Sequence, residues 1–273
     1  MVRLTRVHKI LKSVNFKQHL VRKQNDLVRG LLIKRFYTSL HDNNLIRLGS
    51  SYGGWWVPQF SKENLPAGAI LVSAGLGGDV SFDKEMLRRG FVCIGLDPLV
   101  EAITYSKSEL GMFEQFIPVN AGLSDSQGKK LFYSPQVKEH DSWSINNMHD
   151  TDLSHARQFD VLSLKDLEEI FPPLKHSTFR ILKLDIEGGE IPIIRQIILL
   201  NIKFDFLAVE IDFLSLIPFV SLNKRIRHLF IVWNLMLGLE KMGYSLCKVE
   251  NFNFCWTLIN DKTESSVELN AES

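Results

Sequence analysis

Short apolar runs alternate with amphipathic segments over most of the chain, from residue 69 to residue 259. An apolar run bounded by turn residues is typical of a strand buried on both faces. Apolar positions at steps of three and four residues are typical of helices that cover such a sheet. The chain therefore predicts an α/β fold with a doubly wound, mostly parallel sheet and a terminal antiparallel strand. The predicted strands are 69–74, 91–96, 115–119, 180–184, 205–210, 244–249 and 252–259.

The helices between these strands have recognisable ends. Gly90 stops a helix that turns Phe82, Met86 and Leu87 inward, because glycine readily adopts the left-handed conformation that ends a helix. Ser163 and Asp166 have the spacing of a capping box, which predicts the start of a short helix. The other predicted helices are one that closes at Gly111, one over 188–200 with Pro192 in its first turn, and one over 225–242 that ends at Gly243.

Two segments depart from this alternation. Residues 126–160 are polar and predict a long irregular loop, and a loop of that length inside a compact domain usually has a functional role. In residues 44–58, paired glycines lie beside Tyr52, Trp55 and Trp56. They predict either a hairpin whose aromatic side chains cap the core or a turn that places aromatic rings against a ligand. The sequence does not decide between the two.

The N-terminal segment is strongly basic. Residues 1–35 contain ten Lys and Arg against one acid, which leaves 22 of the 32 bases and 30 of the 31 acids for the rest of the chain. Its helical periodicity predicts an extension over residues 1–48, followed by one domain over 49–260 and a polar tail over 261–273. We expect the extension to pack over the domain edge. Contact with an anionic surface or substrate, or a transit peptide, are the alternatives.

Composition indicates a soluble globular protein, because 45% of the 273 residues are hydrophobic, 23% are charged and the net charge is +1. The cysteines Cys93, Cys247 and Cys255 have no metal-binding spacing and predict buried, reduced thiols. A reducing compartment follows, and we expect the protein in the cytoplasm. We expect neither a membrane span, which needs roughly 18 apolar residues in a row, nor a secretory signal.

Glycines and acids gather where the predicted strands end. Gly75, Gly77 and Gly78 follow the first strand, and glycines let backbone N–H groups approach a bound ligand closely. Asp97 ends the second strand, 22 residues after Gly75, where a carboxylate suits the hydroxyl pair of a ribose. The dinucleotide pattern GxGxxG would need glycine at position 80, where Val80 stands. The turn and Asp97 thus predict an adenosine-type nucleoside, which NAD and S-adenosylmethionine both contain.

The end of the fourth strand carries a family resemblance. Lys183-Leu-Asp-Ile-Glu-Gly-Gly-Glu190 resembles the motif K-(I/L)-D-(I/V)-E-G-x-E of the FkbM-type methyltransferases. Ser73 departs from many class I methyltransferases, in which an acid at this place contacts the methionine amino group. Asp79 and the Gly53-Gly54 segment are the candidates for that contact. The resemblance covers roughly residues 45–258, and the other matching segments are 47–55, 73–83, 95–98, 122–125 and 164–167.

The resemblance implies a class I, Rossmann-like fold that uses S-adenosylmethionine. It also implies methyl transfer to oxygen, commonly a hydroxyl on a sugar, lipid or secondary metabolite. Asp97 would then hold the ribose, and Asp185 would position the sulfonium or the acceptor unless it caps the next helix. The full set expected to bind the cofactor is Gly75, Gly77, Asp79, Asp97, Asn120, Gly122, Leu123 and Asp185.

The catalytic residues are predicted less directly. Asp185 is the first candidate, and His140 beside Trp143 is the candidate general base, since an imidazole titrates near neutral pH. His140, His149 and His155 also fit plain surface-loop residues.

The acids near Asp185 have a plainer interpretation. Glu187 and Glu190 suit the start of a helix, where acids oppose its dipole. Asp185, Glu187 and Glu210 are hard oxygen ligands that suit a divalent cation, but without metal-specific spacing we predict no metal site.

The leading prediction is an S-adenosylmethionine-dependent O-methyltransferase that acts on a small-molecule or glycan acceptor, with no nucleic-acid partner. A nicotinamide-dependent oxidoreductase would use the same glycine turn and Asp97. A binding module on a methyltransferase fold would fit Ser73 and the absence of an evident base. The acceptor stays open, because fold and cofactor motifs do not fix a substrate.

Overall fold

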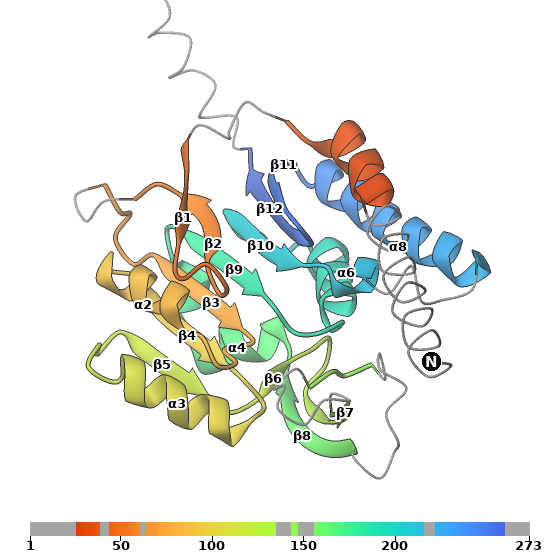
Figure 1. Ribbon diagram of the computed structural model, residues 1–273. Helices are drawn as coiled ribbons and strands as arrows, with labels where there is room; N and C mark the ends of the chain where they lie inside the picture. Colours follow the sequence, from red (N-terminus) through yellow and green to blue (C-terminus); the bar gives the residue numbers. More distant parts are fainter. Residues whose placement is uncertain are drawn as a thin grey trace, which may run out of the picture.

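The computed structural model describes residues 26–38, 44–60, 64–134, 143–146, 156–215 and 222–259 (Figure 1). The strands of its central sheet are β3 (Ile70–Ala74), β4 (Val92–Leu96), β5 (Phe116–Val119), β9 (Arg180–Leu184), β10 (Phe206–Glu210), β11 (Tyr244–Glu250) and β12 (Asn253–Leu258). They lie in the order β11-β12-β10-β9-β3-β4-β5. The five strands from β10 to β5 are parallel, whereas β12 runs antiparallel to both β10 and β11. The predicted strands and the predicted α/β class are confirmed.

Helices cover both faces of the sheet. Each face has its own hydrophobic core, because successive residues of a strand point to opposite sides. Ile70 and Val72 of β3 face one hydrophobic core, which includes residues of α4, α6, α8 and a helix over residues 26–36. Leu71 faces the other core, with α2 and α3. The helix bounds are α2 (Ser81–Arg88), α3 (Val100–Leu110), α4 (Leu164–Ile170), α6 (Glu190–Leu200) and α8 (Leu222–Lys241), with short helices α5 (Pro173–His176) and α7 (Asp212–Ser215).

A second, small sheet corrects the prediction of an irregular loop over residues 126–160. Strand β8 (Ala156–Leu162) lies between β6 (Gly122–Leu123) and β7 (Gly128–Tyr133). The two longer strands each contain several charged or polar residues, and the rings of Phe132 and Phe159 meet at 5.5 Å between centroids. Such strands lack the continuous apolar run that marked the central sheet. Between them, the structure describes only residues 134 and 143–146.

The segment 44–58 forms a hairpin of β1 (Leu45–Leu48) and β2 (Trp55–Pro58). Leu48, Trp55 and Val57 are buried in the core that contains α2. Arg47 anchors the hairpin, because its Nε atom lies 3.1 Å from Oε2 of Glu250 and one guanidinium nitrogen donates to the carbonyl of Ser50.

The helix over residues 26–36 packs on the opposite face of the sheet. Val28, Leu32 and Phe36 are buried there, and Arg35 forms an ion pair with Glu240 of α8 at 3.0 Å. None of the helices in the described ranges combines the length and the apolar character that crossing a lipid bilayer requires.

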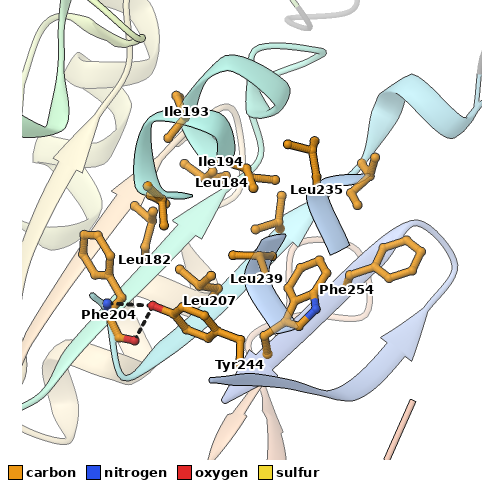
Figure 2. Close-up of a cluster of buried hydrophobic side chains, with 14 of the residues drawn as sticks. Leu182, Leu184, Ile193, Ile194, Phe204, Leu207, Leu235, Leu239, Tyr244 and Phe254 are labelled. Carbon is orange, nitrogen blue, oxygen red and sulfur yellow. Dashed lines mark hydrogen bonds between the residues drawn. The ribbon is translucent and has the colours of Figure 1, made fainter. Parts of the chain in front are cut away.

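One hydrophobic cluster packs against β9, β10, β11 and β12, the strands from the C-terminal part of the chain (Figure 2). The Tyr244 hydroxyl donates to the carbonyl of Phe204 at 2.7 Å and accepts from its N–H at 2.9 Å. Leu182 and Leu207 of β9 and β10 pack in the same cluster (Figure 2). The cluster therefore fixes the strands whose ends carry Asp185 and Glu210.

At the carboxyl edge of the sheet, the backbone of Gly75 lies directly against the backbone of Asp185. Gly75 has a φ of +82°, and a Cβ atom there would overlap the carbonyl oxygen of Asp185. Its N–H donates to Leu96 at 2.9 Å, and the N–H of Asp185 donates to Ala74 at 3.1 Å. Glycine is needed here for backbone packing, in addition to any contact with a ligand.

We predict that Gly75→Ala lowers the free energy of unfolding by about 3 kcal/mol, because a positive φ and steric overlap both add strain. The matched control is Gly68→Ala, since Gly68 has a φ of +73° but nothing within 4 Å of the added Cβ. The control should lose only about 1 kcal/mol. Urea unfolding measures both variants, and equal losses would show that the overlap at Gly75 has no energetic cost.

Candidate functional site

A cavity of about 770 Å³ lies at the carboxyl edge of the parallel strands. Gly75 after β3, Asp97 after β4, Asp185 after β9 and Glu210 at the end of β10 all line it. Parallel strands end at the same edge, so their carboxyl ends bring together residues that are far apart in the sequence. Predicted cofactor residues that line the cavity are Gly75, Gly77, Asp79, Asp97, Gly122, Leu123 and Asp185.

Asp97 holds the glycine turn in place. Its Oδ2 atom accepts from the N–H groups of Leu76 at 3.0 Å and Gly77 at 3.1 Å, and Oδ1 accepts from Leu99 at 2.9 Å. Burial raises the pKa of Asp97, and these backbone bonds act against that rise. The carboxylate therefore has a structural role that its predicted contact with a ribose did not include.

Asn120 supports the site from outside the cavity lining. Its side-chain amide donates to the carbonyl oxygens of Asp97 and Pro98, each at 3.1 Å. Gly122 and Leu123, which follow it closely in the sequence, line the cavity. Asn120 itself is not among the described residues that line it. It fixes the backbone that carries Asp97.

Asp79 joins the hairpin turn to the start of α2. It accepts from the Ser50 hydroxyl at 2.5 Å and from the N–H of Ser81 at 2.9 Å. Burial tends to raise the pKa of Asp79, but the bonds from Ser50, Ser81 and Gly53 outweigh it and leave the pKa lowered. Tyr52, Gly53 and Trp55 line the cavity, so the segment 44–58 is a hairpin whose aromatic side chains also face the candidate site.

Lys183 is a buried cation at the floor of the cavity. Only 5% of its surface is exposed. Its Nζ atom donates to the carbonyl of Gly75, lies 3.3 Å from Oδ2 of Asp185, and sits 5.8 Å from the ring centroid of Trp55. The last residue but one of β9 thus holds both the glycine turn and the acid that follows the strand.

Asp185 and Glu210 form a pair of carboxyl groups on adjacent strands. The register of β9 and β10 aligns Leu184 with Val209, which places the next residue of each strand side by side. Burial, followed by the charge of Asp185 and a hydrogen bond to it, raises the pKa of Glu210 to about 9. Glu210 is therefore neutral at pH 7. Asp185 does not cap the next helix, because α6 begins at Glu190 with Gly189 as its N-cap.

Asp83 is a cavity residue that the sequence analysis missed. It lies in α2, is only 1% exposed, and has the Cys93 thiol 3.5 Å from its Oδ1 atom. Burial raises the pKa of Asp83. A signal was present, because position 83 shares the inward helix face of Met86 and Leu87 through steps of three and four residues.

The aromatic wall of the cavity comes from the small sheet and residues 143–146. Phe132 and Trp143 line the cavity, and Trp143 contacts the Phe159 ring at 5.6 Å between centroids. The Ser144 hydroxyl donates to the carbonyl of Glu187 at 2.5 Å, which ties this segment to the turn after β9. The predicted base His140, together with His149 and His155, lies outside the described residues.

The cavity lining is strongly acidic. Of its described residues, six are acidic and only Lys183 is basic. No cluster of His, Cys, Asp or Glu in the described ranges is arranged to hold a metal ion. The acids are Asp79, Asp83, Asp97, Asp185, Glu187 and Glu210.

An α/β sheet with a glycine turn and an acid at the end of the next strand is typical of proteins that bind nucleotides or nucleosides. Comparison with known protein families identifies the family to which the chain belongs. The pattern of the Methyltransferase FkbM domain matches residues 57–246, more than half of the chain, and includes the ends of β3, β4, β9 and β10 that line the cavity. The chain belongs to the FkbM methyltransferase family, as the motif at Lys183–Glu190 predicted. No curated protein matches the chain.

We predict that Glu210→Gln changes how stability depends on pH. The folded protein favours neutral Glu210, so the stability from this group is present below pH 4.5 and is lost as the pH rises toward about 9. From pH 5 to pH 9 the variant should gain on the order of 1 kcal/mol or more relative to the wild type, since one pKa unit corresponds to about 1.4 kcal/mol. Urea unfolding at both pH values measures this gain.

The control for that experiment is Glu114→Gln, which changes an exposed acid on another part of the surface. Its stability relative to the wild type should not vary with pH. A similarly constant difference for Glu210→Gln would show that Glu210 titrates as an ordinary glutamate.

Proposed function

We propose that this protein transfers a methyl group from S-adenosylmethionine to a hydroxyl oxygen of its acceptor. The proposal includes a class I, Rossmann-like arrangement for residues 49–260. Support for that arrangement comes from the parallel strands around β3 and from the helices on both faces. Family membership supports the methyltransferase activity itself.

The charge of the cavity is the observation that favours this cofactor. S-adenosylmethionine carries a positive sulfonium, whereas the pyrophosphate of NAD carries two negative charges. Six acids and one base line the described part of the cavity, so five acids still face one base when Glu210 is neutral. Opposite charges attract and like charges repel more strongly in a partly buried site than in water. The lining therefore suits the cationic cofactor better than the anionic one.

The strand ends offer a place for each part of the cofactor. A carboxylate has about four lone-pair positions. Asp97 uses three of them for backbone N–H groups, so one stays available for a ribose hydroxyl. On this arrangement Leu123 borders the adenine, and the turn from Gly75 to Asp79 borders the methionine half.

Asp185 is the proposed catalytic residue. When bound, S-adenosylmethionine supplies a methyl group that a hydroxyl oxygen can attack while the carbon–sulfur electron pair leaves on sulfur. The acceptor proton then has to move to a base. Asp185 faces the cavity, and Lys183 holds its carboxylate at 3.3 Å, which orients it. His140 stays an alternative base that lies outside the described residues.

The acceptor end of the cavity is bordered by rings and acids. Trp143, Glu187 and Glu210 all line the cavity, and Ser144, next to Trp143, donates to the carbonyl of Glu187. This lining favours a neutral, hydroxyl-bearing small molecule or glycan over an anionic one. Attachment of the basic N-terminal segment to anionic surfaces and a cytoplasmic location remain predictions from the sequence.

We predict that the wild type binds S-adenosylhomocysteine and that Asp97→Asn weakens this binding at least about tenfold, because the amide faces backbone donors with a donor of its own. Titration calorimetry measures both affinities, with Glu114→Gln as the control. Tighter binding of NADH than of S-adenosylhomocysteine would instead favour the oxidoreductase. Unchanged binding by Asp97→Asn would contradict the proposed nucleoside site.

We also predict that Asp185→Asn lowers turnover about a hundredfold, the usual range for loss of a general base. Affinity for S-adenosylhomocysteine should stay within about threefold, because the nucleoside contacts are intact. The assay follows S-adenosylhomocysteine release with a panel of hydroxyl acceptors. A loss in His140→Asn but not in Asp185→Asn would assign the base to His140. No turnover with any acceptor would favour a binding module.

A further inference from the structure

The amino-acid end of S-adenosylmethionine carries an ammonium group, which needs an anionic partner where water is excluded. Under the proposed function, an acid that lines the cavity is the strongest partner for that group, since it adds charge to the hydrogen bond. Ser73 at the end of β3 cannot do so, because its side chain is an uncharged hydroxyl. The existing contacts of the six lining acids separate the candidates.

The acids nearest the turn and the strand ends are already engaged. Both oxygens of Asp97 accept backbone N–H groups. Both oxygens of Asp79 accept hydrogen bonds, from the Ser50 hydroxyl and the N–H of Ser81. These contacts hold the turn and the hairpin, so a ligand ammonium would have to displace or share them.

The acids at the ends of β9 and β10 also interact with other side chains already. Asp185 pairs with Lys183 at 3.3 Å and is hydrogen-bonded to Glu210. Glu187 lies close enough to Glu210 to raise its pKa further. This group belongs to the edge where the acceptor is proposed to bind.

Asp83 differs from the other lining acids. It is 1% exposed and its neighbours are uncharged: the Cys93 thiol at 3.5 Å and the Ser73 hydroxyl. No ion pair in the described residues includes Asp83, and Lys183 acts on it only from a longer distance. A buried carboxylate without an ion pair is unfavourable, and a cationic ligand group would compensate it.

The place of Asp83 fits the amino-acid end of the ligand. It lies in the first turn of α2, which follows the glycine turn directly. Trp55 and Phe82 line the cavity beside it. The Ser73 hydroxyl is buried next to Asp83 and has no hydrogen-bond partner of its own among the described residues, so the helix delivers a carboxylate to the end of β3, where the strand itself provides only serine.

We propose that the Asp83 carboxylate binds the ammonium group of S-adenosylmethionine and so replaces an acid on β3. The proposal rests on the proposed function, and it assigns this contact to neither Asp79 nor the Gly53-Gly54 segment. The role is one of cofactor binding and orientation, because the methyl group that reacts lies on the sulfur.

Comparing the binding of two ligands distinguishes this contact from the other contacts of the site. S-adenosylhomocysteine has the amino-acid end, whereas 5′-methylthioadenosine has the same nucleoside and sulfur without it. We expect Asp83→Asn to weaken S-adenosylhomocysteine at least about tenfold, the range of a lost charge-assisted hydrogen bond. Its affinity for 5′-methylthioadenosine should stay within about twofold. Titration calorimetry on the full chain measures both, with Asp79→Asn as the matched variant.

Each outcome has a separate meaning. If the wild type binds neither ligand, the proposed function fails. If Asp83→Asn weakens both ligands equally, or if only Asp79→Asn shows the selective loss, the assignment to Asp83 is wrong while the proposed function stands. Should Asp83→Asn not fold, the carboxyl ¹³C shift of Asp83 in the wild type replaces it. That shift should respond to S-adenosylhomocysteine and not to 5′-methylthioadenosine, and the same response to both would overturn the proposal.

Discussion

The contact between Gly75 and the carbonyl of Asp185 sets the geometry of the whole sheet edge. The space that a side chain at position 75 would need is filled by backbone. Lys183 then donates to the carbonyl of Gly75, and Asp97 accepts from the two N–H groups that follow. The turn is thus held from β3, β4 and β9 before any ligand arrives. A site held in this way loses little conformational freedom on binding.

The second constraint is the concentration of acids around one buried lysine. Lys183 compensates Asp185 directly, and Glu210 avoids a further buried charge by staying neutral. Asp83 forms no ion pair among the described residues and is stabilised by Lys183 only from a longer distance. A cationic cofactor would add a close opposite charge, and this links the electrostatics of the cavity to the methyltransferase family to which the chain belongs.

The sequence predicted those parts of the molecule that have a local signal. Continuous apolar runs such as 69–74 and 205–210 marked the parallel strands, and Gly75 and Asp97 marked the site. The small sheet was missed, because β7 and β8 each contain several charged or polar residues and are stabilised by contacts such as Phe132 with Phe159. The burial of Asp83 could have been predicted from its helix face, but its contact with the Cys93 thiol of β4 could not, because that contact joins residues of different elements.

The central claim is that this sheet edge binds the methyl donor with its nucleoside at Asp97 and its sulfur beside Asp185. A crystal structure with S-adenosylhomocysteine tests it most directly. We expect a ribose hydroxyl within hydrogen-bond distance of Asp97, the adenine against Leu123 and the sulfur facing Asp185. A ligand bound elsewhere, or bound here with its ribose turned away from Asp97, would contradict it.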